Sequence, residues 1–238
     1  MVVVKEILHD GMCAGDDRLL LPTLVAYSDG AVLAIDGLES SSCFGLPVPL
    51  IKAGWIEPGL LRERLTAYFR SADSRSDMQL PDVADGTSTA LVYTDPAGSV
   101  HSVSGRWLFD GQEFETGLRP EIRRARASLR SLITGLTIQA HPTKLWLPTT
   151  IQVIVSSDKN YPAAPVVRWP LTAEQTPPLV VTGSPGACSV LDGRQAAAVI
   201  KAQGRRSTAS NWLVNGQSRR LAIGLLVPAM PSCAGRHP

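Results

Sequence analysis

Short runs in which hydrophobic and polar residues alternate recur along this chain, and such alternation predicts β-strands. One such run is Val2–His9. Three further regions hold turn-forming residues between two apolar runs, a pattern that is typical of β-hairpins. The predicted hairpins span 24–35 around Asp29-Gly30, 87–107 around Asp95-Pro96-Ala97-Gly98, and 211–227 around Asn215-Gly216.

Three other regions have the spacing of amphipathic helices. Pro58 suits a first helical turn, and apolar residues follow it at helical spacing up to Asp73. The clearest helix begins at Pro120, and Gly135 is expected near its end. The apolar face of this helix consists of Ile122, Ala125, Leu129, Leu132, Ile133 and Leu136. Asp192 is placed to cap a third helix that runs to about Gln203.

Prolines are dense between His141 and Pro185, and they favour short or edge strands over helices. The apolar runs predicted to form such strands are 150–155, 166–169 and 179–181. The serine-rich segment Asp36–Pro49 is predicted as a loop.

Together these elements predict an α+β protein in which antiparallel β-hairpins pack with about three helices. A chain of 238 residues is long enough for one large domain, and we expect a single domain over 1–238. Each half also has a helix followed by a hairpin. Two similar α-plus-hairpin halves, 1–140 and 141–238, are therefore an alternative plan.

The amino-acid composition indicates the general class of this protein and says little about its activity. Apolar residues make up 44% of the chain and charged residues 18%, which is typical of a globular protein. The net charge of +2 is too small to attract a polyanion, so nucleic acid is not expected as a partner. No apolar stretch reaches 18 residues, and the opening run is too short for a signal-peptide core. We therefore expect no transmembrane segment.

The cysteines leave two interpretations open. Cys13, Cys43, Cys188 and Cys233 are far apart, and none forms a C-x-x-C pair. Their even number permits two disulfides, while four buried thiols in a reducing compartment are the alternative. A metal site built from His9, Cys13, Asp16, Asp17 and Cys43 would not have the spacing of known ligand pairs. No metal and no cofactor is predicted.

One segment is a weak candidate for hydrolysis. Gly86-Thr87-Ser88-Thr89-Ala90 and Asp36-Gly37 faintly resemble the Ser and Asp segments of subtilisin-like hydrolases. A serine nucleophile needs a positioned base, and no histidine stands in the matching context. The candidate residues are Ser88, Asp85 and a nearby histidine such as His101. A turn that leads into a strand is the simpler interpretation.

Four arginines form a second candidate site. Arg119, Arg123, Arg126 and Arg130 are spaced by 4, 3 and 4 residues, which places them in one stripe along the second predicted helix. Such a stripe suits an acidic protein or an anionic surface, although a solvated helix face would have the same pattern.

Four segments spread over most of the chain are informative together: LVAYSDGAV at 24–32, PEIRRARASLRSLI at 120–133, GACSVLDGRQAAAVIKA at 186–202 and NWLVNGQSRRLAIGLLVPAMPSC at 211–233. They resemble a family of uncharacterised actinobacterial exported or lipid-anchored proteins. The family's C-terminal cysteine pair is matched by Cys188 and Cys233, so the resemblance implies a disulfide between them. Such a bridge would close a loop of about 45 residues and add on the order of 3–4 kcal/mol of stability. Cys13 and Cys43 are additional to the family pattern and fit a second bridge or incidental thiols.

Three functional hypotheses follow. The first is a non-enzymatic envelope or extracellular binding protein stiffened by Cys188–Cys233. The second is a hydrolase that uses Ser88 or Asp85 with a nearby histidine, and the third is an intracellular protein that binds a partner through the stripe Arg119–Arg130. The family's export segment has no counterpart here, so we expect an extracellular or envelope location if that segment was removed or missed, and a cytoplasmic one otherwise.

Overall fold

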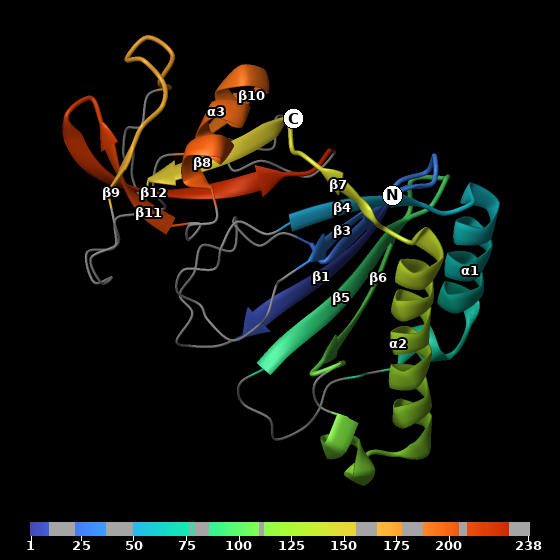
Figure 1. The fold of residues 1–238 in the computed structure, drawn as a ribbon. Helices are drawn as coiled ribbons and strands as arrows, with labels where there is room; N and C mark the ends of the chain where they lie inside the picture. The colour runs from blue at the N-terminus through green and yellow to red at the C-terminus, as the bar shows by residue number, and fades with distance from the viewer. Residues whose placement is uncertain are drawn as a thin grey trace. The chain divides into compact units, whose positions relative to one another are not determined.

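The computed structural model describes residues 1–9, 22–36, 50–76, 78, 86–109, 112–155, 166–177, 188–204 and 209–228, with the backbone alone at 2–9, 36, 86–87 and 209–210. These residues form two compact units, one up to Trp146 and the other from Leu147 onward. Figure 1 shows the elements of each unit. The division lies close to position 140/141, at which the sequence suggested two halves.

The first unit contains a seven-stranded sheet in the order β6-β5-β1-β2-β3-β4-β7, with every neighbouring pair antiparallel. Its strands are β1 (Val2–His9), β2 (Leu24–Ala26), β3 (Ala31–Asp36), β4 (Leu50–Trp55), β5 (Gly86–Thr94), β6 (Val100–Arg106) and β7 (Lys144–Trp146). Strand β1 pairs with both β2 and β5, and it thereby joins the first two predicted hairpins into one sheet.

Both predicted hairpins of this unit form around the expected turns. Between β2 and β3, Asp29 Oδ1 accepts a hydrogen bond from the Ala31 N–H at 3.0 Å, and Gly30 has a φ of +89° that favours glycine. Between β5 and β6, Asp95 Oδ1 accepts hydrogen bonds from the N–H groups of Ala97 and Ser99, each at 2.9 Å. Aspartate therefore supplies the local acceptor in both turns.

Helices α1 (Pro58–Arg70) and α2 (Pro120–Ala140) cover one face of this sheet (Figure 1). Each begins at the predicted proline. Ahead of α1, the Glu57 carboxylate accepts hydrogen bonds from the N–H groups of Gly59 at 2.8 Å and Leu60 at 2.5 Å. These hydrogen bonds hold the pKa of Glu57 below its usual range.

Helix α2 continues through Gly135 and ends at His141, whose φ of +42° is left-handed. The predicted end near Gly135 is therefore wrong. A Cβ on Gly135 would lie 3.0 Å from Nη1 of Arg64, which belongs to α1. The far end of the flexible Arg64 side chain thus approaches the helix closely at this position.

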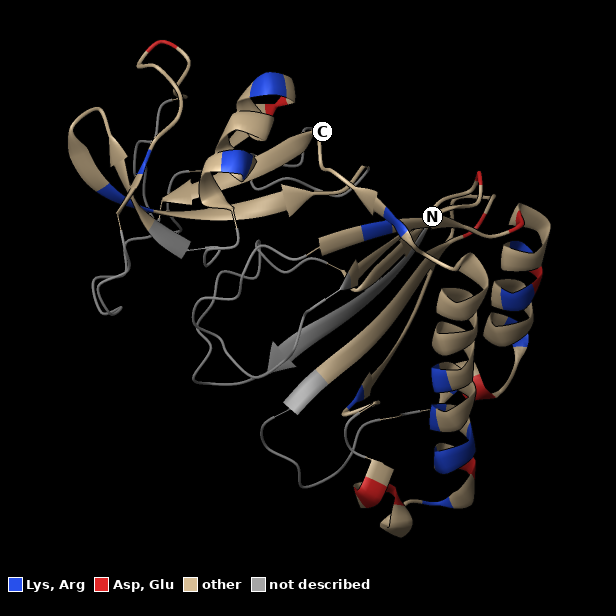
Figure 2. Ribbon diagram, in the orientation of Figure 1, with Lys and Arg blue, Asp and Glu red and all other residues tan. Residues whose placement is uncertain are grey.

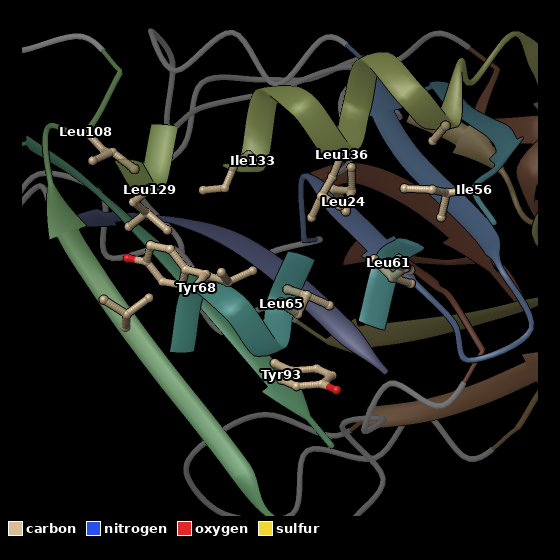
Figure 3. Close-up of a cluster of buried hydrophobic side chains, with 14 of the residues drawn as sticks. Leu24, Ile56, Leu61, Leu65, Tyr68, Tyr93, Leu108, Leu129, Ile133 and Leu136 are labelled. Atoms are coloured by element: carbon tan, nitrogen blue, oxygen red, sulfur yellow. The ribbon is translucent and has the colours of Figure 1, made fainter. Parts of the chain in front are cut away.

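The core of the first unit lies between the two helices and the sheet face that they cover (Figure 3). Strand residues two positions apart point to the same face, as Leu24 and Ala26 do on β2 and Leu91 and Tyr93 do on β5. The helices contribute the buried residues Leu61, Leu65, Tyr68, Ala125, Leu129, Ile133, Leu136 and Ala140. Of the predicted apolar face of α2, Ala125, Leu129, Ile133 and Leu136 are core residues, and Leu132 packs against them.

The second unit contains a five-stranded sheet in the order β10-β8-β12-β11-β9, in which only β9 and β11 are parallel. Its strands are β8 (Thr150–Val155), β9 (Val166–Arg168), β10 (Cys188–Asp192), β11 (Ala209–Val214) and β12 (Gln217–Leu226), and its helix is α3 (Gly193–Gln203). The rings of Trp169 and Trp212 meet edge to face in its core, with centroids 5.2 Å apart.

The prediction of a short strand at 150–155 is confirmed by β8, which lies inside the sheet because no proline interrupts Thr150–Val155 and its N–H groups remain free to pair. One expectation for this unit needs correction. Asp192 stands at the N-cap position of α3, but its side chain makes no capping hydrogen bond. The predicted strand 179–181 lies outside the described residues.

The α+β fold class is confirmed, with antiparallel hairpins and three α-helices among the described residues. A helix followed by a hairpin occurs once in each unit, as α1 with β5–β6 and α3 with β11–β12. Strands β4, β7 and β10 were not predicted. Lys52 and Gly54 weaken the apolar alternation of β4, and β7 has only three residues.

Candidate functional site

A groove of about 440 Å³ lies in the first unit, between the sheet and the second half of α2. We call it the helix–sheet groove. Its described lining residues are Thr23, Leu24, Ala34, Ile35, Lys52, Phe109, Ile133, Thr134, Thr137, Ile138 and Pro142. Its volume falls in the range of about 300–1,000 Å³ that is usual for ligand pockets.

The sheet wall of the groove follows from strand register. Leu24 on β2 lies opposite Ala34 on β3, and Ala34 lies opposite Lys52 on β4. Residues that face each other on neighbouring strands share one face of the sheet. Because Leu24 is part of the core beneath the helices, Lys52 lies on the same helix-covered face.

The helix wall comes from one stripe of α2. Ile133, Thr134, Thr137 and Ile138 are spaced by 1, 3 and 1 residues, which places them along one side of the helix. The helix has no charged residue from 131 to 140, whereas its arginines gather in the first half (Figure 2). Ile138 is nevertheless 70% exposed. The exposed surface of this helix half is therefore uncharged, with Ile138 as its large exposed apolar residue.

Close contact between α2 and β4 limits the groove at Pro142. A Cβ on Gly54 would lie 2.2 Å from the Ala140 carbonyl oxygen and 2.9 Å from Cα of Pro142. Only glycine permits this approach. Gly54 and Lys52 are two residues apart on β4, so both face the helix.

The walls are mostly apolar, with a single charged side chain. Lys52 is the only charged residue among the described lining residues, and it is half-buried. Three threonines add hydroxyl groups, of which Thr137 Oγ1 donates to the Ile133 carbonyl oxygen at 3.1 Å. The described walls hold no histidine, cysteine or carboxylate. This arrangement suits binding of an apolar ligand.

No protein-family model, curated protein or solved structure matches the chain.

The structure separates Ser88 from His101. Ser88 on β5 lies opposite Arg106 on β6, and His101 lies opposite Tyr93, five residues further along β5. This offset corresponds to about 16 Å along the strand. The two side chains also lie on opposite faces, because odd-numbered Tyr93 and its partner face the helices and even-numbered Ser88 does not. His101 therefore cannot serve Ser88 as a base, and Asp85 lies outside the described residues.

His101 instead belongs to the β5–β6 turn. Its Nε2 lies 3.2 Å from Oδ2 of Asp95, and its ring lies against Phe69 and Tyr93 at centroid distances of 5.3 and 5.9 Å. The hydrogen bond from His101, followed by that from the Ser99 N–H, holds the pKa of Asp95 below its usual range. A role in holding the turn accounts for this pair.

The predicted arginine stripe is divided, because two of its members are engaged inside the protein. Arg126 is fully buried, and its Nε donates to Glu115 Oε1 at 2.6 Å. Its other nitrogens donate to the carbonyl oxygens of Met78, Arg106 and Trp107 at 2.6, 2.9 and 2.9 Å. Arg130 donates to both carboxylate oxygens of Glu115 and to the Leu108 carbonyl oxygen.

We call Arg126, Glu115 and Arg130 the Arg126 cluster. It ties α2 to the short helix η3 (Gln112–Gly117) and to the segment after β6. Burial tends to raise the pKa of Glu115, but the hydrogen bonds from Arg130 and Arg126 outweigh it, so this pKa is lowered. The hydrogen bonds of the cluster stabilise the fold, and neither Arg126 nor Arg130 is available to bind an external partner.

The remaining two arginines are exposed. Arg119 lies 3.3 Å from a Glu121 carboxylate oxygen, and Arg123 is exposed one turn further along α2. The four arginines therefore do not form one binding surface, since Arg126 faces the core. The helical spacing alone does not show which side of the stripe is buried.

Of the cysteines, only Cys188 lies within the described residues, at the start of β10, and it is not a free thiol. Cys13, Cys43 and Cys233 lie outside them, so the pairing with Cys233 stays a prediction.

The described residues contain no group of three or more histidines, cysteines and acids that could hold a metal ion. The side chain of His9 and residues 13, 16, 17 and 43 lie outside that search. Within the same part of the chain, no helix is long and apolar enough to cross a membrane.

The helix–sheet groove was missed by the sequence analysis. One signal was present, because Ile138 lies outside the predicted apolar face of a helix half that has no charge. The sequence contained no signal for Lys52 as a groove residue, since β4 was not predicted. Only strand pairing brings Lys52 opposite α2.

Proposed function

We propose that this protein is a non-enzymatic binding protein that holds an apolar ligand in the helix–sheet groove. One observation carries the proposal: an apolar groove of about 440 Å³ has a helix wall without charge and a 70% exposed isoleucine at its rim. Exposed apolar surface beside a cavity is characteristic of ligand sites. The separation of Ser88 from His101 also argues against these two residues as a nucleophile and base.

Binding of a neutral fluorescent probe tests the proposal. N-phenyl-1-naphthylamine fluoresces in apolar surroundings, so we expect saturable binding with a Kd in the micromolar range. Ile138→Glu places a charge at the groove and should weaken binding at least tenfold. Val100→Glu is the matched control, because Val100 is 68% exposed on β6 and does not line the groove. Absence of saturable binding, or equal loss in both variants, would overturn the proposal.

We further propose that the protein works outside the cytoplasm with a Cys188–Cys233 disulfide. Support comes from the resemblance to exported proteins and from Cys188, which is not a free thiol. Thiol titration of the unfolded, unreduced protein from its native compartment should find at most two free thiols. Peptide mapping should recover a linked Cys188–Cys233 fragment. Four free thiols would contradict both the disulfide and the location.

A further inference from the structure

We infer that the helix–sheet groove binds the alkyl chain of a linear lipid without recognising its head group, and that the chain continues over Leu145 and Leu50 at the edge of the sheet. The inference rests on the proposed function, since it assigns the ligand class and the path of the ligand in the same groove. Three features carry it: engaged polar groups in the walls, a row of side chains that leads to the sheet edge, and exposed aliphatic side chains beside that row.

The polar side chains of the described walls leave little to bind a head group. Lys52 and Thr23 already interact with other residues of the protein, and Thr137 Oγ1 donates to the Ile133 carbonyl oxygen at 3.1 Å. The remaining polar residue among those described, Thr134, is exposed to water. A polar head group inside the groove would have to break one of these contacts or stay unpaired, and both cost free energy. The head group therefore stays in water, and the chain is the part that the groove binds.

The floor of the groove belongs to a row of side chains that crosses the sheet. The row lies on the neighbouring strands β2, β3, β4 and β7 and consists of Leu24, Ala34, Lys52 and Leu145. Neighbouring strands lie about 4.8 Å apart, so the row is about 14 Å long. Leu24 is 3% exposed at one end and Leu145 is 54% exposed at the other. Lys52 can contribute its methylene stem to such a floor while its charge keeps its partner. A row of this length from the core to the sheet edge suits an extended chain better than a compact ring system.

Exposed aliphatic side chains continue the floor at the edge of the sheet. Leu50 lies two residues before Lys52 on β4, so it shares the helix-covered face, and it is 53% exposed. Leu145 lies directly opposite Lys52, and Ile138 on α2 is 70% exposed at the rim of the groove. A chain that covers these residues removes apolar surface from water, and each CH₂ group so buried should tighten binding about fourfold.

A series of alcohols tests recognition of the chain. Octanol, decanol and dodecanol are each used to displace N-phenyl-1-naphthylamine from the full-length protein. We expect the midpoint of displacement to fall at least about tenfold with each two added carbons. Equal midpoints for the three alcohols would overturn recognition of the chain.

Substitutions at the sheet edge test the path of the chain. Leu145→Ser and Leu50→Ser should each weaken dodecanol binding at least about fivefold more than octanol binding, because only the longer chain reaches the edge. Val100→Ser is the matched control, since Val100 is 68% exposed on β6, the other edge strand of the same sheet, and does not line the groove. It should weaken both alcohols equally or not at all. Circular dichroism verifies folding, and either leucine variant alone is sufficient if the other unfolds. Equal effects on both alcohols in the leucine variants would overturn the proposed path.

Ligands with one chain and different head groups test the role of the head group. Decanol, decanoate and decyltrimethylammonium should displace the probe at concentrations within about threefold of one another at pH 8. A preference of tenfold or more for one of them would show that the groove recognises the head group and would overturn the inference. In either case, binding of the probe itself leaves the proposed function standing. Failure of the probe to bind would overturn both.

Discussion

Arg126 has a different role in the structure from the one that its spacing in the sequence suggests. By spacing it belongs to a surface stripe, yet its guanidinium is fully buried and donates four hydrogen bonds. A guanidinium can be buried when a carboxylate and carbonyl oxygens satisfy its donors together. Glu115 and three backbone carbonyls do so here, which makes Arg126 a structural residue.

Replacing Arg126 with methionine should destabilise the protein by about 3–5 kcal/mol, because Glu115 and the carbonyl oxygens lose a buried partner. Urea unfolding followed by circular dichroism measures the loss. Arg123→Met, at an exposed position of the same helix, should change the free energy of unfolding by less than about 0.5 kcal/mol. Similar effects of the two substitutions would contradict a structural role for Arg126.

The Arg126 cluster also predicts a pH dependence. The pKa of Glu115 is lowered in the folded protein, so the unfolded chain takes up the proton first as pH falls. The stabilisation is complete above the usual glutamate pKa of about 4.3 and is lost as pH falls through the lower folded value. Free energies of unfolding measured between pH 6 and 2.5 should fall in the wild type. In Glu115→Gln they should start lower and fall less, and parallel curves would show that Glu115 is not the group responsible.

At the β5–β6 turn, removing the His101 ring should raise the pKa of Asp95 toward its usual value. The hydrogen bond from His101 is the main cause of the lowering, so His101→Ala removes it and leaves the bonds from Ser99 and Ala97. Carbon-detected NMR titration of the Asp95 carboxyl group measures the shift. An unchanged pKa would show that the backbone bonds are sufficient.

At the scale of elements, a glycine decides how closely a helix and a strand approach. Gly54 on β4 lets the end of α2 contact the strand, because a Cβ there would meet backbone atoms of Ala140 and Pro142. Its backbone conformation is ordinary, so the requirement comes from the neighbouring atoms. A sequence shows the glycine but not what lies beside it.

Gly54→Ala should therefore destabilise the first unit by about 1–3 kcal/mol, as overpacking usually does. The added Cβ would lie 2.2 Å from the Ala140 carbonyl oxygen, so α2 has to shift. Gly117→Ala is the control, because nothing lies within 4 Å of a Cβ at that position. Thermal unfolding compares the two variants, and an unchanged midpoint for Gly54→Ala would contradict the close approach.

At the scale of the whole molecule, the chain divides into two units, and both cysteines of the proposed disulfide belong to the second. Reduction should therefore lower the opening free energies of the second unit by on the order of 3–4 kcal/mol, as expected for a loop of about 45 residues. Hydrogen exchange with mass spectrometry, with and without reductant, measures this for each peptide. Peptides from 50–146 serve as the internal reference, and equal destabilisation of both units would contradict a bridge confined to the second.

The sequence by itself determined the elements whose signals are local. Hairpin turns, helix starts and the apolar face of α2 depend on residues a few positions apart, so Pro58, Pro120 and Asp95-Pro96-Ala97-Gly98 were enough to locate them. Tertiary structure decided everything that depends on pairing between distant segments. It placed β4 beside β3 and thereby brought Lys52 opposite α2, it buried Arg126, and it put Ser88 and His101 on opposite faces of one hairpin. The physical reason is that burial and strand register arise from contacts across the sheet, and spacing along one segment does not encode them.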